Sequence, residues 1–307
     1  MRVLIVGLGS IAAKHIQALR EIDPLINIDA LRSSPDYKEY EGVKSILYLP
    51  ETPEYDFIII SNPTSLHAKT LNELYKFGIP IMIEKPLFED VLYNDLIDNI
   101  EKSGILSYVA CNLRFLGCIS FLHDFIKENQ DLIINEVNVY CGSYLPEWRP
   151  VMDFKKSYSA NPKLGGGVHL DLIHEIDYVC YLFGRPKKSL GICRNVSSLN
   201  IDSIDYANYI LMYEDFTASI VLNYYRRDYK RTIEIVFDNC TWTADLKLNT
   251  IRDNNGKIIY KGNQENTYKK QILYFLDLIK RKEKAENDIK YAYDTLKIAM
   301  KYEGFEG

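Results

Sequence analysis

Paired cysteines are missing from this sequence: its six cysteines are scattered, and no two of them form a CxxC motif. A chain of 307 residues is also too large to need disulfide staples. We therefore expect reduced thiols and a cytoplasmic protein. The cysteines are Cys111, Cys118, Cys141, Cys180, Cys193 and Cys240.

Long apolar runs are missing as well, since no segment approaches the roughly 20 residues that a membrane-spanning helix needs. The first residues, up to Ala13, superficially resemble a signal peptide. However, Gly7 and Gly9 interrupt the apolar run, and Lys14 and His15 lead into an amphipathic pattern, which favours a strand, a turn and a helix. We expect neither a membrane span nor a leader.

A large excess of one charge is also absent, because the net charge is only −5. The densest basic stretches, Arg226–Arg231 and Lys280–Lys284, are short, and an acid interrupts each of them. A nucleic-acid-binding protein usually carries a basic patch or stripe. No nucleic-acid partner is therefore expected.

A hydrophobic content of 47% is ordinary for a globular protein, and no repeat or low-complexity segment is present.

In the first part of the chain, short apolar runs alternate with segments of helical periodicity. This alternation is typical of an α/β, doubly wound parallel sheet of the Rossmann type. Strands are predicted at Arg2–Val6, Asn27–Leu31, Val43–Leu47, Asp56–Ser61, Pro80–Ile83 and Leu106–Ala110, and helices at Ile11–Ile22, Ser65–Phe77 and Leu92–Lys102.

Beyond Arg114 the pattern changes, because strands follow strands through short connections, which favour antiparallel pairing in an open sheet. We expect two domains: residues 1–114 form the parallel α/β domain, and residues 115–307 form an α+β domain with a mostly antiparallel sheet. Helices of the second part are predicted at Ile119–Lys127, Leu170–Leu182, Tyr268–Lys282 and Ile289–Tyr302.

A glycine-rich turn follows the first predicted strand and opens the first helix. Gly7 permits the tight turn, Gly9 lets backbone N–H groups approach a pyrophosphate, and Ala12 packs the helix against the strand. The helix N-terminus favours the anion. In this position a dinucleotide site is favoured over a purely structural turn, with Gly7, Gly9, Ser10, Ile11 and Ala12 as its residues.

The end of the second strand bears on the choice of cofactor. NAD-binding domains normally carry an acid there, whereas this chain has Arg32-Ser33-Ser34, which suits a 2′-phosphate. NADP is therefore favoured over NAD. Both stay open, because Asp29 or Asp36 would serve as the ribose acid if the strand ended elsewhere, and Arg32 is alternatively part of a solvated turn.

Two further strand ends carry candidate cofactor residues. Asn62, Pro63 and His67 lie where the fourth strand meets a helix, although a histidine there is more commonly a satisfied helix residue. Glu84 and Lys85 follow a buried strand. A cation at this edge stabilises charge on a substrate oxygen as hydride leaves, and the alternative is a solvated lysine.

The last constellation is a triple-glycine segment, Gly165–Gly167, followed by His169, Asp171 and His174. Asp171 and His174 share a face if they lie on one helix. An imidazole oriented by a carboxylate is a common general base. The three side-chain types would also suit a metal, but their spacing is not an established zinc pattern, so we expect no metal.

Taken together, these motifs resemble the Gfo/Idh/MocA family, named for glucose-fructose oxidoreductase, inositol dehydrogenase and rhizopine catabolism proteins. Their order and spacing cover nearly the whole chain. The matching segments are GLGSIAAKH from Gly7, SNPTSLH from Ser61, IEKP from Ile83, NLRF from Asn112 and GGGVHLDLIHEIDYVCYLFG from Gly165.

The resemblance implies that Lys85 contacts the reacting oxygen and that His174 is the acid or base. It also implies a second-domain sheet that commonly forms a dimer or tetramer interface. One departure is that the usual aspartate, four residues before the histidine, is Leu170 here. The resemblance therefore assigns His174 by its position in the motif, whereas Asp171 is a substrate ligand or an orienter at a shifted position.

The segment Gly142–Pro150 is similar to a branch of the family associated with surface-polysaccharide sugars. Trp148 and Arg149 would hold a sugar ring and a phosphate or carboxylate, and an interface loop is the equally open alternative. Arg114, in the NLRF segment, is a further candidate substrate ligand.

We predict an NAD(P)-dependent oxidoreductase that transfers hydride to or from a secondary alcohol or ketone carbon of a sugar, sugar nucleotide or cyclitol, and that forms a homodimer or homotetramer. The alternative is a catalytically silent dinucleotide-binding sensor or assembly protein. The presence of both Lys85 and His174 argues against it, because a binder needs only the glycine turn.

Overall fold

The computed structural model describes residues 1–35 and 39–302 of the chain. These residues fall into two compact units, each built around one sheet. The first unit contains Met1–Asn112 and also Asn266–Asp294, and the second contains Leu113–Glu265 and the residues from Thr295. In the described part of the chain, no helix has both the length and the apolar character needed to cross a bilayer.

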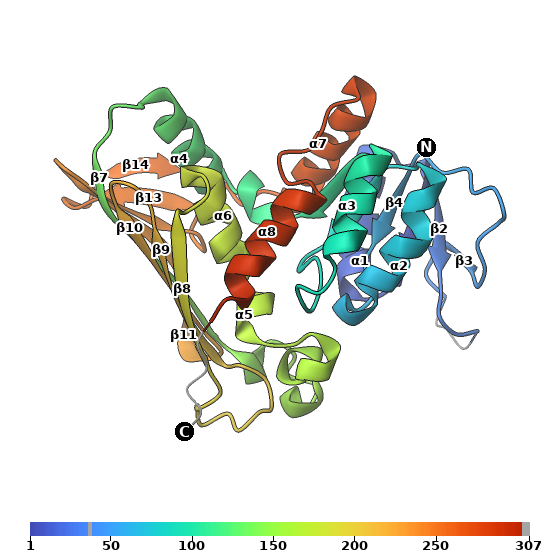
Figure 1. Cartoon of the computed structure of the whole chain (residues 1–307), viewed down its shortest axis with the longest axis horizontal. Helices are drawn as coiled ribbons and strands as arrows, with labels where there is room; N and C mark the ends of the chain where they lie inside the picture. Colours follow the sequence, from blue (N-terminus) through green and yellow to red (C-terminus); the bar gives the residue numbers. More distant parts are fainter. Residues whose placement is uncertain (36–38, 303–307) are drawn as a thin grey trace. The chain divides into compact units, whose positions relative to one another are not determined.

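The first unit contains a six-stranded parallel sheet in the order β3-β2-β1-β4-β5-β6, drawn in blue to green in Figure 1. Its strand order and direction confirm the predicted doubly wound arrangement. Val3, Ile58 and Met82 are completely buried, as expected for strands covered on both faces. The strands are β1 (Arg2–Val6), β2 (Asn27–Leu31), β3 (Lys44–Ile46), β4 (Phe57–Ile60), β5 (Ile81–Glu84) and β6 (Ser107–Ala110).

The three helices predicted before Arg114 are all present, with one difference. The helix predicted at Ser65–Phe77 is divided into a 3₁₀ turn (Thr64–Leu66), α2 (His67–Leu74) and a second 3₁₀ turn (Tyr75–Phe77). Helix α7, which is distant in sequence, packs against α1. The other helices are α1 (Ser10–Ile22), α3 (Asn94–Ser103), α7 (Thr267–Arg281) and the first part of α8 (Ile289–Met300).

The second unit contains an eight-stranded sheet in the order β14-β13-β12-β11-β7-β10-β9-β8. Its pairs are antiparallel except for β7 with β10, which confirms the predicted mostly antiparallel sheet. The strands are β7 (Ile134–Tyr144), β8 (Lys188–Arg194), β9 (Tyr206–Met212), β10 (Thr217–Asn223), β11 (Tyr225–Phe237), β12 (Thr241–Asp245), β13 (Thr250–Asp253) and β14 (Ile258–Lys261).

Two of the second unit's helices, α4 (Gly117–Glu128) and α6 (His174–Phe183), pack against each other, and α6 lies on β7 and β10 (Figure 1). The helix predicted at Leu170–Leu182 is wrong as a single element. The chain instead forms a short α5 (Val168–Asp171), leaves the helical conformation at Leu172, where φ is −102° and ψ is 29°, and starts α6 at His174.

Candidate functional site

The carboxyl ends of four neighbouring strands form one row in the first unit. Val6 pairs in register with Leu31 on one side and with Ile60 on the other, and Ile60 pairs with Ile83. The residues that follow, including the glycine turn, Arg32, Ser61 and Glu84, therefore lie along one edge of the sheet. In open α/β sheets this edge is where ligands bind.

The glycine turn has the geometry of a phosphate-binding cradle. Gly7 has φ +82°, and a Cβ atom there would lie 2.8 Å from Cα of Asn62, so only glycine fits. At Gly9, by contrast, no described atom outside its chain neighbours lies within 4 Å of a Cβ position. No described side chain caps α1, which leaves its first N–H groups open. These features fit the pyrophosphate of a dinucleotide.

Strand β2 ends at Leu31, so Arg32 stands at the sheet edge, where its backbone N–H bonds to the carbonyl of Ile46 at 2.8 Å. Ser33 and Ser34 are exposed beside it. Asp36, one of the alternative ribose acids, lies outside the described residues.

Asp29, the other alternative, lies in the middle of β2 and is buried. Its Oδ2 accepts hydrogen bonds from Arg2 at 2.8 Å and from the hydroxyl of Tyr55 at 2.9 Å. Burial, together with the hydrogen bond to Asp29, raises the pKa of Tyr55 to about 12. These partners hold the Asp29 carboxylate within the protein, away from the strand end.

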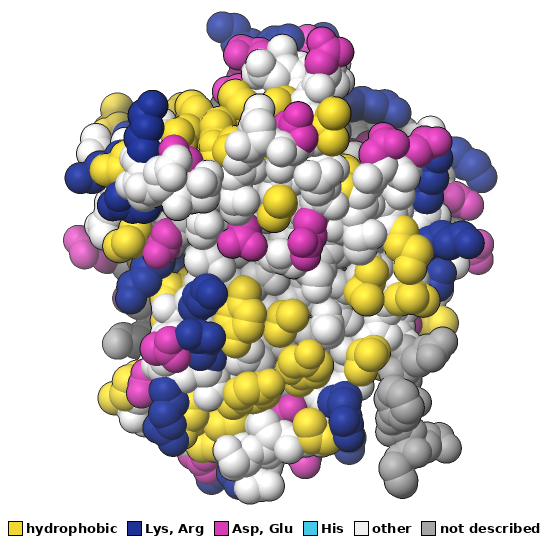
Figure 2. All heavy atoms as spheres, turned by 90° about the vertical axis from the view of Figure 1, so that its left-hand side faces the viewer, with side chains coloured by type: hydrophobic (Ala, Val, Ile, Leu, Met, Phe, Trp, Pro, Cys, Tyr) yellow, Lys and Arg dark blue, Asp and Glu magenta, His cyan; other side chains and the backbone are white. Residues whose placement is uncertain are grey.

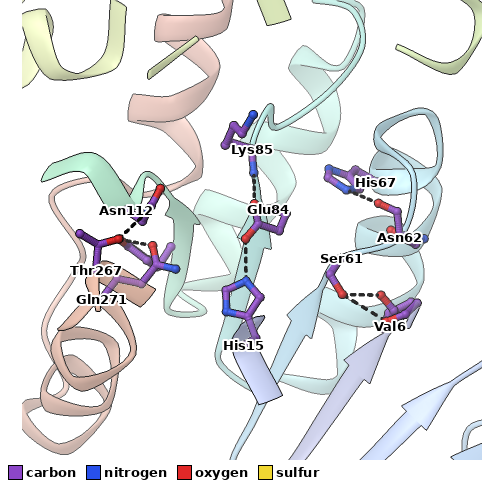
Figure 3. Close-up of polar contacts among 12 residues, drawn as sticks. Val6, His15, Ser61, Asn62, His67, Glu84, Lys85, Asn112, Thr267 and Gln271 are labelled. Atoms are coloured by element: carbon purple, nitrogen blue, oxygen red, sulfur yellow. Dashed lines mark hydrogen bonds and ion pairs between the residues drawn. The ribbon is translucent and has the colours of Figure 1, made fainter. Parts of the chain in front are cut away.

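His67 contacts two loops at the edge of the sheet. Its Nε2 lies 3.0 Å from the carbonyl oxygen of Asn62 (Figure 3). Its Nδ1 lies 3.0 Å from the carbonyl oxygen of Leu87. Burial lowers the pKa of His67, although both carbonyl contacts act in the opposite direction. The side-chain Oδ1 of Asn62 is buried and has no hydrogen-bond partner among the described residues. Pro63, next to it, is exposed.

Glu84 and Lys85 point in opposite directions in Figure 3. The Glu84 carboxylate is buried, and its Oε1 lies 2.6 Å from Nε2 of His15, which is on α1. Its Oε2 accepts a hydrogen bond from the backbone N–H of Lys85 at 3.2 Å. The carboxylate is therefore directed into the protein, and the half-buried Lys85 is the charged group of this segment nearer to solvent.

In the second unit, the break at Leu172 separates Asp171 from His174, so the two are not on one continuous helix. Asp171 ends α5, and the buried His174 begins α6. At the start of α5, Gly167 has φ +139°, and the N–H of Val168 bonds to the carbonyl of Ile204 at 2.8 Å. This geometry starts the helix earlier than the periodicity predicts.

Tyr224 is a further candidate residue, which the sequence motifs did not indicate. Its hydroxyl donates a hydrogen bond to Oδ2 of Asp171 at 2.5 Å, and its side chain is fully buried. Burial and the neighbouring Asp171 charge raise the pKa of Tyr224 well above its ordinary value. The only sequence signal is a polar and aromatic run that directly follows β10.

Trp148 packs edge-on against Tyr224, with ring centroids 5.3 Å apart, and donates from Nε1 to Oγ of Ser143 at 2.9 Å. Asp171, Tyr224 and Trp148 thus form one connected cluster. Arg149, next to Trp148, is exposed. An aromatic face beside a carboxylate is a combination that suits a hydroxylated ring.

Arg114 has a clear structural partner. Its Nε and one terminal nitrogen donate to the two oxygens of Asp177 on α6 at 2.9 and 2.7 Å, and both side chains are buried. This paired geometry is the strong form of an arginine–carboxylate contact. The predicted contact between Arg114 and a substrate stays a prediction.

His169 is buried, and that burial lowers its pKa to about 4. Over residues 1–35 and 39–302 there is no group of three or more histidine, cysteine, aspartate or glutamate side chains arranged to hold a metal ion.

Two family models match this chain. One, described as an oxidoreductase family with an NAD-binding Rossmann fold, matches residues 1–106, and the other, described as the GFO/IDH/MocA C-terminal domain, matches residues 134–243.

Curated relatives are similar over part of their length. The myo-inositol 2-dehydrogenase of Thermotoga maritima is 25% identical over 60% of this chain and 55% of the relative. The scyllo-inositol 2-dehydrogenase (NADP⁺) of Bacillus subtilis is 23% identical over 60% of this chain and 50% of the relative. The chain therefore spans about half the length of these relatives.

Solved structures match in fold over nearly the whole chain. Levoglucosan dehydrogenase in complex with NADH and levoglucosan has a TM-score of 0.85 at 15% identity and covers 98% of this chain and 95% of that chain. The WlbA dehydrogenase of Bordetella pertussis, in complex with NADH and UDP-GlcNAcA, has a TM-score of 0.80 at 15% identity and covers 97% and 94%.

Proposed function

Because this chain belongs to the GFO/IDH/MocA family of oxidoreductases, we propose that it transfers hydride to or from a secondary alcohol or ketone carbon of a sugar, sugar nucleotide or cyclitol. The observation that carries the proposal is the row of strand ends in the first unit. The open glycine turn, Arg32, Asn62 and Lys85 all follow strands of that row. The nicotinamide of a bound dinucleotide supplies the hydride donor or acceptor.

Each proposed catalytic side chain has a distinct role. Lys85 stabilises negative charge on the substrate oxygen, because a cation at a developing alkoxide lowers the barrier to hydride loss. His174 moves the proton of the same hydroxyl group. Asp171, held by Tyr224, binds or orients the substrate hydroxyl. Trp148 and Arg149 contribute an aromatic face and a positive charge to substrate binding.

The glycine turn, Ser10, Ile11 and Ala12 bind the pyrophosphate, and Arg32, Ser33 and Ser34 bind a 2′-phosphate, so NADP is the preferred cofactor. The support for NADP is the position of Arg32 directly after β2, together with the commitment of Asp29 to Arg2 and Tyr55. Asn62, Pro63 and His67 shape the neighbouring wall of this cofactor site.

We also propose that the chain forms a homodimer or homotetramer through the second-unit sheet. Leu190 on β8 and Ile210 on β9 pair in register, and their side chains are 52% and 39% exposed. Gly191 and Tyr209, which alternate with them, are buried. Figure 2 shows hydrophobic side chains gathered on this side of the molecule. Sedimentation of the protein with Leu190→Glu and Ile210→Glu tests this proposal, which predicts dissociation to a monomer.

The direct experiment measures binding of NADPH and NADH to the purified protein and then screens sugars, sugar nucleotides and cyclitols for a change in nicotinamide absorbance. His174→Ala is the control for chemistry. Turnover that disappears in this variant, with nucleotide binding retained, supports the proposal. Binding without turnover on any substrate favours the dinucleotide-binding sensor, and an absence of binding contradicts the proposal.

A further inference from the structure

A buried histidine joins the helix of the glycine turn to the segment that carries Lys85. His15 is 0% exposed, and its Nε2 lies 2.6 Å from Oε1 of Glu84 (Figure 3). His15 and Glu84 are 69 residues apart in sequence and belong to α1 and β5. A buried carboxylate is costly without hydrogen-bond partners, so this contact fixes where Glu84 can lie.

The second oxygen of Glu84 extends the contact to Lys85. It accepts the backbone N–H of Lys85 at 3.2 Å, so one carboxylate holds both the imidazole of His15 and the peptide that carries Lys85. We propose that His15 and Glu84 are positioning residues that fix Lys85 relative to the glycine turn. This inference rests on the proposed function, in which Lys85 contacts the substrate oxygen.

The position of His15 on α1 connects its hydrogen bond with Glu84 to the proposed cofactor site. His15 lies five residues after Ser10, which places it about 7.5 Å along the helix axis from the end that faces the pyrophosphate. One buried hydrogen bond therefore joins α1, whose N-terminus faces the proposed cofactor site, to the end of β5, which precedes Lys85. A shift of either element changes the distance between Lys85 and the cofactor.

The imidazole has little freedom to turn away. The ring of Tyr268, on α7, packs edge-on against it with centroids 5.6 Å apart. Nδ1 of His15 is buried and has no hydrogen-bond partner among the described residues. Glu84 is therefore the side chain to which the polar end of His15 is directed.

Two substitutions separate positioning from simple stability. His15→Leu removes the hydrogen bond and keeps an apolar side chain, whereas His15→Gln offers an amide nitrogen close to the place of Nε2. Tyr55→Phe is the matched control, because it removes one hydrogen bond to a buried carboxylate, Asp29, in the same unit. Each protein is compared by its kcat per nucleotide-binding site, its Kd for NADPH and its thermal midpoint.

We expect His15→Leu to lower kcat per binding site by about tenfold to a hundredfold, because a displacement near 1 Å in a catalytic group has effects of that size. Its Kd for NADPH stays near the wild-type value, and the primary deuterium isotope effect on kcat rises. His15→Gln recovers most of the loss, and Tyr55→Phe keeps kcat. If His15→Leu lowers the thermal midpoint but keeps kcat per binding site and the isotope effect, the proposal is wrong.

A readout without turnover keeps this inference separate from the proposed function. The rate at which acetic anhydride modifies Lys85, measured by mass spectrometry, is compared between wild type and His15→Leu, with Lys69 as the internal reference. We expect a change of several-fold at Lys85 alone. An unchanged rate overturns the positioning role even if no substrate is found, whereas a changed rate in a protein without turnover counts only against the proposed function.

Discussion

The hydroxyl of Tyr224 donates a hydrogen bond to Oδ2 of Asp171 across 2.5 Å, and the two residues are 53 positions apart in the sequence. The bond orients a carboxylate at the end of a short helix, beside the break that precedes His174. It also links that carboxylate to Trp148, whose ring packs against Tyr224. Asp171 is therefore held from outside its own helix, by a residue next to the sheet.

Tyr224→Phe should weaken substrate binding and lower stability. The substitution keeps the ring against Trp148 and removes one hydrogen bond to the half-buried Asp171 carboxylate, which costs about 1 kcal/mol of unfolding free energy. We expect KM for the substrate to rise about tenfold, which corresponds to about 1.4 kcal/mol. Steady-state kinetics and urea unfolding measure the two effects. The neighbouring Tyr225→Phe, on an exposed side chain, is the control and should change neither.

Lys85→Met should abolish most of the catalysis without loss of cofactor. Removing one group that stabilises a developing oxyanion costs about a hundredfold to a thousandfold in kcat. NADPH affinity, followed by nicotinamide fluorescence, should change by less than about threefold. A variant that keeps wild-type kcat would assign Lys85 to the solvated strand end instead.

Two glycine variants distinguish a cofactor cradle from a structural turn. Gly7→Ala meets Asn62 and has an unfavourable positive φ, so it should lower stability by about 1–3 kcal/mol. Gly9→Ala meets no described atom outside its chain neighbours, so its thermal midpoint should match wild type. If the space above Gly9 holds a pyrophosphate, Gly9→Ala nevertheless weakens NADPH binding. Normal binding by a stable Gly9→Ala protein would favour the structural turn.

Arg32→Ala should change cofactor preference more than overall activity. Charge-assisted hydrogen bonds to a phosphate contribute about 1.5–3 kcal/mol, so the Kd for NADPH should rise about tenfold to a hundredfold. The Kd for NADH, which lacks the 2′-phosphate, should stay within a few-fold. Equal changes for both nucleotides would show that Arg32 does not read the phosphate.

His169 should make the protein sensitive to acid. Burial lowers its pKa to about 4 in the folded state, below the ordinary value of about 6.5. Between these two values the unfolded state binds more protons, so stability is fully present above pH 6.5 and is lost as pH falls towards 4. The loss amounts to about 3 kcal/mol. Urea unfolding at pH 7.5 and 4.5 should show a smaller difference for His169→Phe than for wild type.

The sequence predicted the local elements well because each is determined by its own pattern. The limits of β1 and β2 match the prediction. The glycine turn follows β1 and Arg32 follows β2, as the sequence predicted. Local pattern could not predict contacts between distant segments. The packing of α7 on α1, the bond from Glu84 to His15 and the partner of Asp171 all join residues more than 50 positions apart.

The helix break at Leu172 shows the same limit in another form. The apolar spacing from Leu170 to Leu182 suits one helix, but the backbone of Gly167 and the bond from Val168 to Ile204 set the start of α5. The short α5 ends at Asp171, beside the Tyr224 hydroxyl. The apolar spacing of the sequence therefore does not indicate that α5 and α6 are separate helices.

The most direct test of the proposed hydride transfer follows deuterium from NADPH to the substrate. The protein is incubated with NADPH that carries deuterium at both positions of C4 of the nicotinamide and with a panel of ketosugars, keto sugar nucleotides and inosose-type cyclitols. The products are analysed by mass spectrometry. The proposed function predicts deuterium on a carbinol carbon of at least one product, and no transfer by His174→Ala. Tight NADPH binding with no deuterium in any product would contradict it.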